Sequence, residues 1–306
     1  MAITIEDRAK GAMLGLAIGD AMGAPVEFRP RGKFPPVTGF RDGGPFKLKA
    51  GQWTDDTAMA LCLAQSLIDC QGMDASDQME KYLKWVNEGY MSCTGQCVGM
   101  GQTILRALSR YHKTKDPFQG DPRPKHSGNG CIMRLAPVPV FYYSNCLVAM
   151  LEAVNSARVT HASPQALQCT AYFSGLIWGA LNGLSKEQLL QPYFSPCEEL
   201  EFSHLHKDVD RVLNGSYKSM PEEELSPTGY VVDSLEVALW GFCNFDNFEQ
   251  GLLAVVNLGG DADTTGAIYG QLAGSYYGCK GILPVYKENL ADTEFINKLA
   301  GKLLEN

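Results

Sequence analysis

Apolar residues recur along the chain at intervals of three and four positions, the spacing of helices with one buried face, whereas strict alternation is scarce. This pattern predicts helices over residues 6–22, 56–70, 76–88, 101–112, 163–183, 230–242, 246–257, 264–278 and 292–304. Segments rich in Pro and Gly separate them and predict loops over 29–53, 113–130, 191–203 and 214–229. The predicted fold class is therefore all-α, with long loops that we expect to carry function. No linker or run of like charge divides the chain, so we expect one domain over 1–306.

Two of the predicted helices carry glycine at every fourth position. The positions are Gly11, Gly15, Gly19 and Gly23 in the first, and Gly266, Gly270, Gly274 and Gly278 in the later one. An interior glycine costs about 1 kcal/mol of helix propensity relative to alanine, so close packing of another backbone should offset it. The simplest interpretation is tight helix crossing in the core. If the two stripes face each other, the ends of both helices meet at one place.

The composition narrows the class of protein. With 306 residues, 45% of them hydrophobic, the chain can bury a core without disulfides. A formal charge of −8 disfavours nucleic acid and anionic membranes as partners. The ten cysteines are scattered, and Cys93 and Cys97 lack the spacing of a zinc or redox pair, which indicates reduced, mostly buried thiols. We expect a soluble, cytoplasmic monomer without a signal peptide or membrane span.

Two acidic clusters stand at predicted helix starts. The first contains Thr54, Asp55 and Asp56, and the second contains Asp261, Asp263 and Thr264. Either cluster alone is explained by helix capping. Together they supply more carboxylates than two caps require, and four aspartates brought together would repel one another without cations. Oxygen ligands without His or Cys select Mg²⁺, Mn²⁺ or Ca²⁺, and two such ions would balance the charge, orient a substrate and activate water.

Glu27 follows the first glycine-striped helix in an apolar context, where an unpaired carboxylate would be costly. It either bonds to backbone amides of its own turn or, if the stripes converge, lies near the acidic clusters. In the second case it could act as an exchangeable ligand or an acid/base group.

Six motifs together resemble the ADP-ribosylglycohydrolase family and occur in that family's order. They span 11–23, 53–57, 128–137, 160–164, 228–230 and 259–266. The resemblance implies a bundle of stacked helices around a cleft that holds two Mg²⁺ or Mn²⁺ ions. It makes the six residues of the acidic clusters metal ligands and places Glu27 at the family's mobile glutamate near the scissile bond.

The resemblance also implies a substrate site. Glycines in Gly128-Asn129-Gly130-Cys131 let backbone amides approach an anion, although an ordinary tight loop would have the same composition. By the resemblance this loop contacts the diphosphate and distal ribose. Met133 then supports the pocket, and Arg134 anchors the loop to a buried acidic partner.

Four aromatic residues remain, of which two belong to the predicted substrate site and two do not. His161 could be a core histidine, but the resemblance places it beside the diphosphate, where a ring N–H can donate to an anion. Tyr230 could be a core aromatic at a helix start, but the resemblance sets it against adenine. His204 and His206 match no motif, and we expect them at the surface.

One position departs from the family pattern. An aspartate that lies near the acceptor side of the cleft in arginine-specific members falls on Gly99 here. The departure questions an arginine acceptor and leaves the acidic clusters untouched.

The sequence thus predicts a metal-dependent hydrolase that cleaves the N- or O-glycosidic bond between ADP-ribose and an acceptor, most simply a protein side chain. Its predicted catalytic residues are Glu27, Asp55, Asp56 and Asp263. Two alternatives stay open at this point: a non-catalytic ADP-ribose-binding or structural relative, and a dinuclear-metal hydrolase of phosphate esters.

Overall fold

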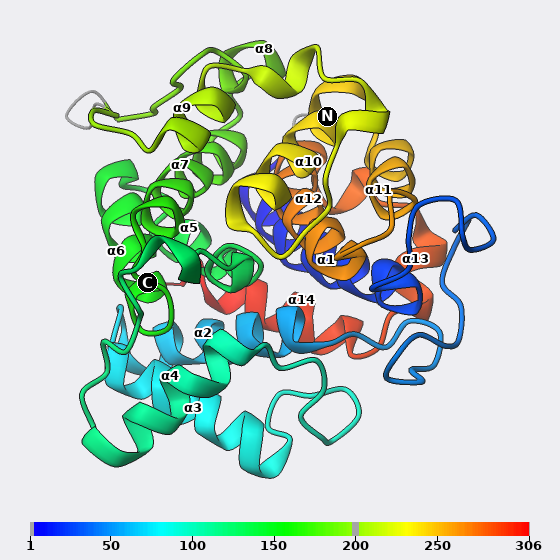
Figure 1. Ribbon diagram of the computed structural model, residues 1–306. Helices are drawn as coiled ribbons and strands as arrows, with labels where there is room; N and C mark the ends of the chain where they lie inside the picture. Colours follow the sequence, from blue (N-terminus) through cyan, green and yellow to red (C-terminus); the bar gives the residue numbers. More distant parts are fainter. Residues whose placement is uncertain (1–2, 198–201, 306) are drawn as a thin grey trace.

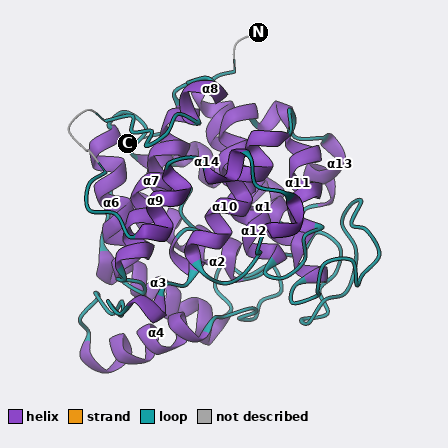
Figure 2. Ribbon diagram, turned by 45° about the horizontal axis from the view of Figure 1, so that its top comes forward, coloured by secondary structure: helices purple, strands orange, loops and turns teal. Residues whose placement is uncertain are grey.

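The computed structural model describes residues 3–197 and 202–305, so residues 198–201 of the predicted loop 191–203 lie outside it. Within the described ranges the secondary structure consists of fourteen α-helices and six short 3₁₀ helices, which confirms the all-α class (Figure 2). The α-helices are α1 (Ile5–Gly23), α2 (Asp55–Cys70), α3 (Ala75–Glu88), α4 (Gln102–Thr114), α5 (Pro137–Phe141), α6 (Cys146–Arg158), α7 (Pro164–Leu181), α8 (Lys186–Leu189), α9 (Lys207–Leu213), α10 (Val231–Asn244), α11 (Phe248–Val256), α12 (Ala262–Tyr277), α13 (Pro284–Asn289) and α14 (Thr293–Lys302). The 3₁₀ helices are η1 (Ala24–Val26), η2 (Pro124–His126), η3 (Asn129–Cys131), η4 (Ser216–Lys218), η5 (Glu222–Glu224) and η6 (Cys279–Gly281).

Each of the nine predicted helices is present, with ends shifted by a few residues, and five helices were not predicted. Four of those five, α5, α8, α9 and α13, have seven residues or fewer. The fifth, α6, buries mainly small residues such as Ala149, Ala153 and Ala157, which give a weak apolar signal. Its N-cap Asn145, whose side chain accepts from the Val148 amide, was the local signal for a helix start.

Helices α1 and α12 pack backbone against backbone along their glycine stripes, and together they form the centre of the molecule (Figure 1). A methyl group built on Gly11, Gly15 or Gly19 would strike the carbonyl oxygen of Gly274, Gly270 or Gly266, respectively. The pairing runs in opposite directions along the chain, so the helices are antiparallel. The end of α1 therefore lies beside the start of α12, as expected if the stripes face each other.

Other helices surround this central pair. α12 also packs against α7, α10 and α11, whereas α1 packs against α2 and α14. Beyond them α6 covers α7, and α3 and α4 extend outward from α2, which places them at the bottom of the view in Figure 1. The described buried apolar side chains form one connected core that includes residues of α1, α2, α7, α10 and α12.

The long segment 27–54 connects α1 to α2 and is fixed at two points. Asn257 accepts from the Val37 amide at 2.8 Å and donates to the Val37 carbonyl at 3.0 Å. Trp53 is buried and donates from its indole N–H to the Ala291 carbonyl at 3.2 Å. The segment is thereby attached to the end of α11 and to the connection between α13 and α14.

Two predictions on general character can be compared with the structure. Of the ten cysteines, four are buried, five are partly buried and Cys70 is exposed, so burial is less complete than we expected. Among the described helices, none is both long and apolar enough to cross a bilayer.

Candidate active site

Asp20 supplies the cap of a helix from another part of the chain. This residue lies fully buried on α1, and its carboxylate accepts from the backbone amides of Thr54 and Thr57 at the start of α2, at 2.9–3.0 Å. The two threonine hydroxyls donate to the same carboxylate at 2.9 and 2.7 Å. Because Asp20 provides these acceptors, Thr54 makes no side-chain capping bond of its own. Its hydroxyl hydrogen is used on Asp20, and its oxygen lone pairs remain for another ligand.

The N-cap residue of α12, like that of α2, makes no side-chain capping bond to its own helix. Asp261 occupies the N-cap position, yet its side chain caps no amide of the helix. One of its oxygens instead accepts from the Asn129 amide group at 2.6 Å. Capping, the simplest alternative, therefore does not account for Thr54 or Asp261, whereas one oxygen of Asp263 does accept from the Thr264 amide at 2.8 Å.

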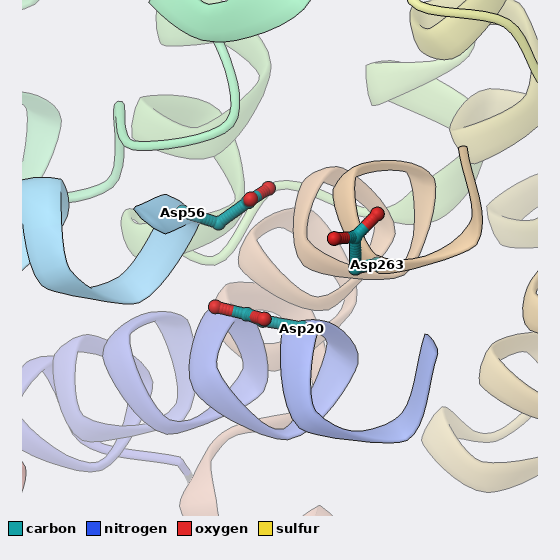
Figure 3. Close-up of side chains that lie close together, drawn as sticks. All are labelled: Asp20, Asp56 and Asp263. Carbon is teal, nitrogen blue, oxygen red and sulfur yellow. The ribbon is translucent and has the colours of Figure 1, made fainter. Parts of the chain in front are cut away.

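Carboxylates from α1, α2 and α12 converge in two overlapping groups. Oxygens of Asp20, Asp56 and Asp263 all lie within 4.8 Å of one another, and Figure 3 shows these three side chains directed toward a common space. Oxygens of Glu27, Asp261 and Asp263 form a second group within the same limit. Asp263 belongs to both groups and is buried, so it joins them into one acidic centre.

Burial makes ionisation of this centre costly. It raises the pKa of Asp20 to about 6, that of Asp55 to about 7 and that of Glu27 to about 8, and neighbouring carboxylates add to the shift of the latter two. The pKa values of Asp56 and Asp263 are raised well above the ordinary range for the same two reasons. At neutral pH the centre therefore either retains protons or requires compensating positive charge.

The donor set fits hard divalent cations. One buried oxygen of Glu27 and one of Asp56 have no hydrogen-bond partner among the described residues, which is costly unless a ligand completes them. The side chains that converge are carboxylates and threonine hydroxyls, the ligands that Mg²⁺ and Mn²⁺ prefer. The residues of the acidic centre therefore suit Mg²⁺ or Mn²⁺.

A turn of two glycines brings Glu27 to the centre. Gly259 and Gly260 both have left-handed φ angles, of 72° and 63°. This conformation lets the Gly260 carbonyl accept from the Phe28 amide at 2.6 Å, while its amide donates to the Arg29 carbonyl at 2.9 Å. The segment after α1 is thereby fixed beside the start of α12, and Glu27 is buried there.

A cleft of about 250 Å³ opens above the acidic centre. It is lined on one side by Glu27, Asp55, Asp261, Asp263 and Thr264, on another by Gly128, Asn129, Gly130, Met133 and His161, and elsewhere by Phe28, Gly99, Gly101, Gln102, Thr103, Ile104 and Gly229. Ten of the predicted site residues thus meet at one cleft. Thr54 and Asp56 are buried at the acidic centre and are not among the lining residues.

The glycine loop is held from both sides. The Asn129 amide donates to the Gly229 carbonyl at 3.1 Å, and the Asn129 side chain bridges Asp261 and Ser234. The imidazole of His161 packs against Gly130, where an added methyl group would lie only 2.8 Å from a ring carbon. A side chain at position 130 would therefore displace the histidine from the cleft.

A family model described as ADP-ribosylglycohydrolase matches residues 1–306. The chain belongs to the ADP-ribosylglycohydrolase family. It is 38% identical over 300 residues to the ADP-ribosylarginine hydrolase Tri1 of Pseudomonas putida, covering 98% of this chain and 78% of that protein. It is 32% identical to the ADP-ribosyl-[dinitrogen reductase] glycohydrolase of Rhodospirillum rubrum, covering 91% and 88% of the two chains. A solved ADP-ribosylglycohydrolase-related protein complex superposes with a TM-score of 0.86 at 42% identity, covering 98% of each chain.

These findings confirm the family and the enzyme class predicted from the motifs. The protein is an ADP-ribosylglycohydrolase, a hydrolase of glycosyl bonds. The role of each site residue remains a prediction, and the structure places some of them differently from what the family resemblance implies.

Three residues for which the resemblance implies a role in the site make different contacts in the structure. Cys131 is buried, and its thiol faces the Gly128 and Ala166 carbonyls. Tyr230 is not among the lining residues, and its hydroxyl donates to Asp208 at 2.9 Å. Arg134 has no acidic partner among the described residues, contrary to prediction. Its two terminal nitrogens instead donate to neutral acceptors, the Gly130 carbonyl and a threonine hydroxyl.

Two further positions complete the comparison with the sequence. His204 is exposed as expected, whereas His206 is half-buried and caps α9 by accepting from the Asp208 amide.

Sequence reasoning missed Asp20 as a site residue. The available signal was the one carboxylate within the apolar, glycine-striped stretch 11–23 of this helix, where it required buried partners.

Gly99, where the resemblance places an aspartate of the family, adopts a left-handed φ of 87°. A Cβ at this position would collide with the Asp55 carboxylate and lie 3.2 Å from the Thr54 side chain. In this conformation the loop therefore has no space for the missing carboxylate, and the wall of the cleft there is backbone.

Proposed function

We propose that this enzyme uses two divalent cations, Mg²⁺ or Mn²⁺, to hydrolyse the bond between ADP-ribose and a protein side chain, which reverses mono-ADP-ribosylation. The observation that carries the proposal is the shared position of Asp263 in two carboxylate groups beneath one cleft. The names of two relatives, an ADP-ribosylarginine hydrolase and an ADP-ribosyl-[dinitrogen reductase] glycohydrolase, support a protein-linked ADP-ribose.

The residues proposed to hold the cations are Thr54, Asp55, Asp56, Asp261, Asp263 and Thr264. When bound, such ions supply the positive charge that an acidic site needs in order to accept an anionic substrate, together with Lewis acidity toward its oxygens. Asp20 acts as a positioning residue in this scheme, because its carboxylate orients Thr54 and the first turn of α2.

Glu27 is the proposed acid/base group. It lines the cleft, and burial is the largest cause that raises its pKa in the metal-free protein, so its surroundings favour a proton on this carboxylate. Asp55, Asp56 and Asp263, also predicted to be catalytic, would act through the cations that they hold.

The opposite wall is proposed to bind the remainder of ADP-ribose. The backbone amides of Gly128 and Gly130 and the ring of His161 would bind a diphosphate from this wall of the cleft. Asn129, whose backbone amide donates to the Gly229 carbonyl, would hold the loop beside them, and Met133 would support it. Cys131 would contribute from beneath the loop. Tyr230 remains proposed for adenine, through its ring alone, since its hydroxyl is bound to Asp208.

The proposal also includes the domain organisation, oligomeric state, location and partners that the sequence predicts. We treat residues 1–306 as one domain, supported by the pairing of an N-terminal helix with one near the C-terminus. A cytoplasmic monomer without nucleic acid or membrane as partner agrees with the charge of −8.

The test is metal-dependent release of ADP-ribose from arginine- and serine-modified proteins and from O-acetyl-ADP-ribose, with Mg²⁺ or Mn²⁺ present. Asp263→Asn should reduce turnover at least about 100-fold, since even second-shell partners of a metal are worth 10–100-fold. Its helical signal should be retained. Asp246→Asn is the matched control, because Asp246 is fully exposed.

The two alternatives give different results in the same assay. Binding of ADP-ribose without any turnover would indicate a non-catalytic relative. Hydrolysis of simple phosphate esters without affinity for ADP-ribose would indicate a different dinuclear hydrolase. Full activity in Asp263→Asn would contradict the assigned metal role.

A further inference from the structure

A buried arginine lies directly behind the histidine of the cleft and pairs with no carboxylate among the described residues. Arg134 is fully buried. Its Nη1 donates to the Gly130 carbonyl at 2.7 Å, and its Nη2 donates to the Thr160 hydroxyl oxygen at 2.7 Å. The guanidinium also lies 5.0 Å from the centroid of the Tyr82 ring. A single cation thus holds the glycine loop and the residue that precedes His161.

The hydroxyl of Thr160 connects this arginine to the histidine. Its oxygen lies 2.8 Å from His161 Nδ1, and Thr160 is fully buried. Because arginine can only donate, the Thr160 oxygen accepts from Arg134, and its one hydrogen is left for His161 Nδ1. A hydrogen on Nδ1 would leave the Thr160 hydroxyl hydrogen without an acceptor among the described residues, which is unfavourable in a buried site.

The direction of these bonds determines which ring nitrogen can reach a ligand. A neutral imidazole whose Nδ1 accepts carries its hydrogen on Nε2. Burial and the charge of Arg134 lower the pKa of His161 to about 3, so the ring is neutral near pH 7. Nε2 lies close to Gly128 and Gly130, two residues that line the cleft. A methyl group built on Gly128 would be 3.3 Å from this nitrogen, and one built on Gly130 would be 3.2 Å from it. No described residue accepts a hydrogen bond from His161 Nε2.

Building on the proposed function, we propose that Arg134 and Thr160 are positioning residues that fix His161 as the Nε2–H tautomer, which donates to the diphosphate of ADP-ribose. The same arginine fixes the glycine loop whose amides face that anion. Donor and loop are therefore in place before the ligand arrives, so little ordering remains to be done on binding.

The tautomer can be read without any activity. Long-range ¹H–¹⁵N spectra of protein labelled with ¹⁵N-histidine separate the two neutral tautomers, and a His161→Asn variant assigns the signal among the five histidines. We expect the wild-type ring to carry its hydrogen on Nε2. A hydrogen on Nδ1, or a charged ring at pH 7, would overturn the proposal.

Substitution of Thr160 then tests the consequence for binding. Thr160→Val keeps the shape but removes the hydroxyl, so we expect mixed tautomers and about tenfold weaker ADP-ribose binding in calorimetry with Mg²⁺, the loss of one hydrogen bond to an anion. Thr160→Ser restores the hydroxyl and should restore both readings. Ser174 lies in the C-terminal half of α7, and its buried hydroxyl donates to the Ala149 carbonyl of α6. Ser174→Ala removes this hydroxyl and should change neither the tautomer nor the affinity.

The outcomes separate the two proposals. Equal weakening by Thr160→Val and Thr160→Ser, or unchanged tautomer and affinity in Thr160→Val, would overturn the positioning role. If Thr160→Val does not fold, the wild-type spectrum still decides the tautomer. A wild-type protein that shows the Nε2–H ring but releases no ADP-ribose would reject the proposed function and support the positioning role.

Discussion

The seam between α1 and α12 and the acidic centre at its end are built from the same two helices but are completed in opposite ways. Along the seam, glycine backbones meet directly, and the protein supplies every contact. At the centre, buried oxygens of Glu27 and Asp56 lack hydrogen-bond partners among the described residues, and burial raises the pKa values of these carboxylates. The seam is complete in the protein alone, whereas the centre requires charge from outside.

This contrast indicates what the seam is for. Glycine at every fourth position lowers helix propensity, so two such stripes are costly unless a close approach is needed. That approach sets the end of α1, which carries Asp20, against the start of α12, which carries Asp263. The backbone packing therefore fixes the spacing of carboxylates that would otherwise repel one another.

The largest expected effect comes from breaking the seam. Gly15→Ala would place a methyl group against the Gly270 carbonyl, and neither backbone can move without shifting a helix. We expect a loss of about 3 kcal/mol in the free energy of unfolding, at the upper end for overpacking. Denaturant unfolding measures it. In contrast, Gly301→Ala adds a methyl group to α14 with nothing within 4 Å and should be neutral or slightly stabilising. Equal effects of the two changes would contradict a tight seam.

The centre should depend on pH and on metal in a way that the seam does not. The pKa values of Asp20, Asp55 and Glu27, raised to about 6, 7 and 8, mean that the folded, metal-free protein binds protons that the unfolded chain releases. This contribution is fully present below about pH 4 and is lost as the pH rises through about 6 to 8.

Thermal unfolding in EDTA should therefore show a lower melting temperature at about pH 8 than at about pH 5. Mg²⁺ or Mn²⁺ should stabilise most at the higher pH, by about 2.7 kcal/mol for one site at 100 times its Kd. A metal-induced shift that is the same at both pH values would contradict the origin of the effect in these carboxylates.

A smaller effect is expected from placing an aspartate at position 99, where the resemblance expects one. Gly99→Asp combines a left-handed backbone with a collision at Asp55, so we expect roughly tenfold weaker Mn²⁺ binding, about 1.4 kcal/mol. Gly95→Asp is the matched control, because Gly95 has a similar φ of 70° but open space around it. It should cost about 1 kcal/mol of stability without changing metal affinity. Tighter metal binding in Gly99→Asp would show that the loop rearranges to accept the carboxylate.

The sequence predicted the features that repeat or cluster, and it missed those that depend on partners distant in the chain. The glycine stripes predicted close packing of each helix against another backbone, but they left open whether the two stripes face each other. Asp20 could not be assigned a role, because its partners on α2 lie more than thirty positions away. The side chains of Arg134 and Tyr230 were given partners by analogy, and the structure shows a hydroxyl and an aspartate that no local pattern indicates.

The central claim is that carboxylates at the starts of α2 and α12 hold a pair of cations. Equilibrium dialysis of Mn²⁺ against the metal-free protein tests it most directly. We predict two ions per chain in the wild type and weakened binding of both in Asp263→Asn, since Asp263 belongs to both carboxylate groups. Failure of the wild type to bind Mn²⁺, or an unchanged pair of ions in Asp263→Asn, would contradict the account.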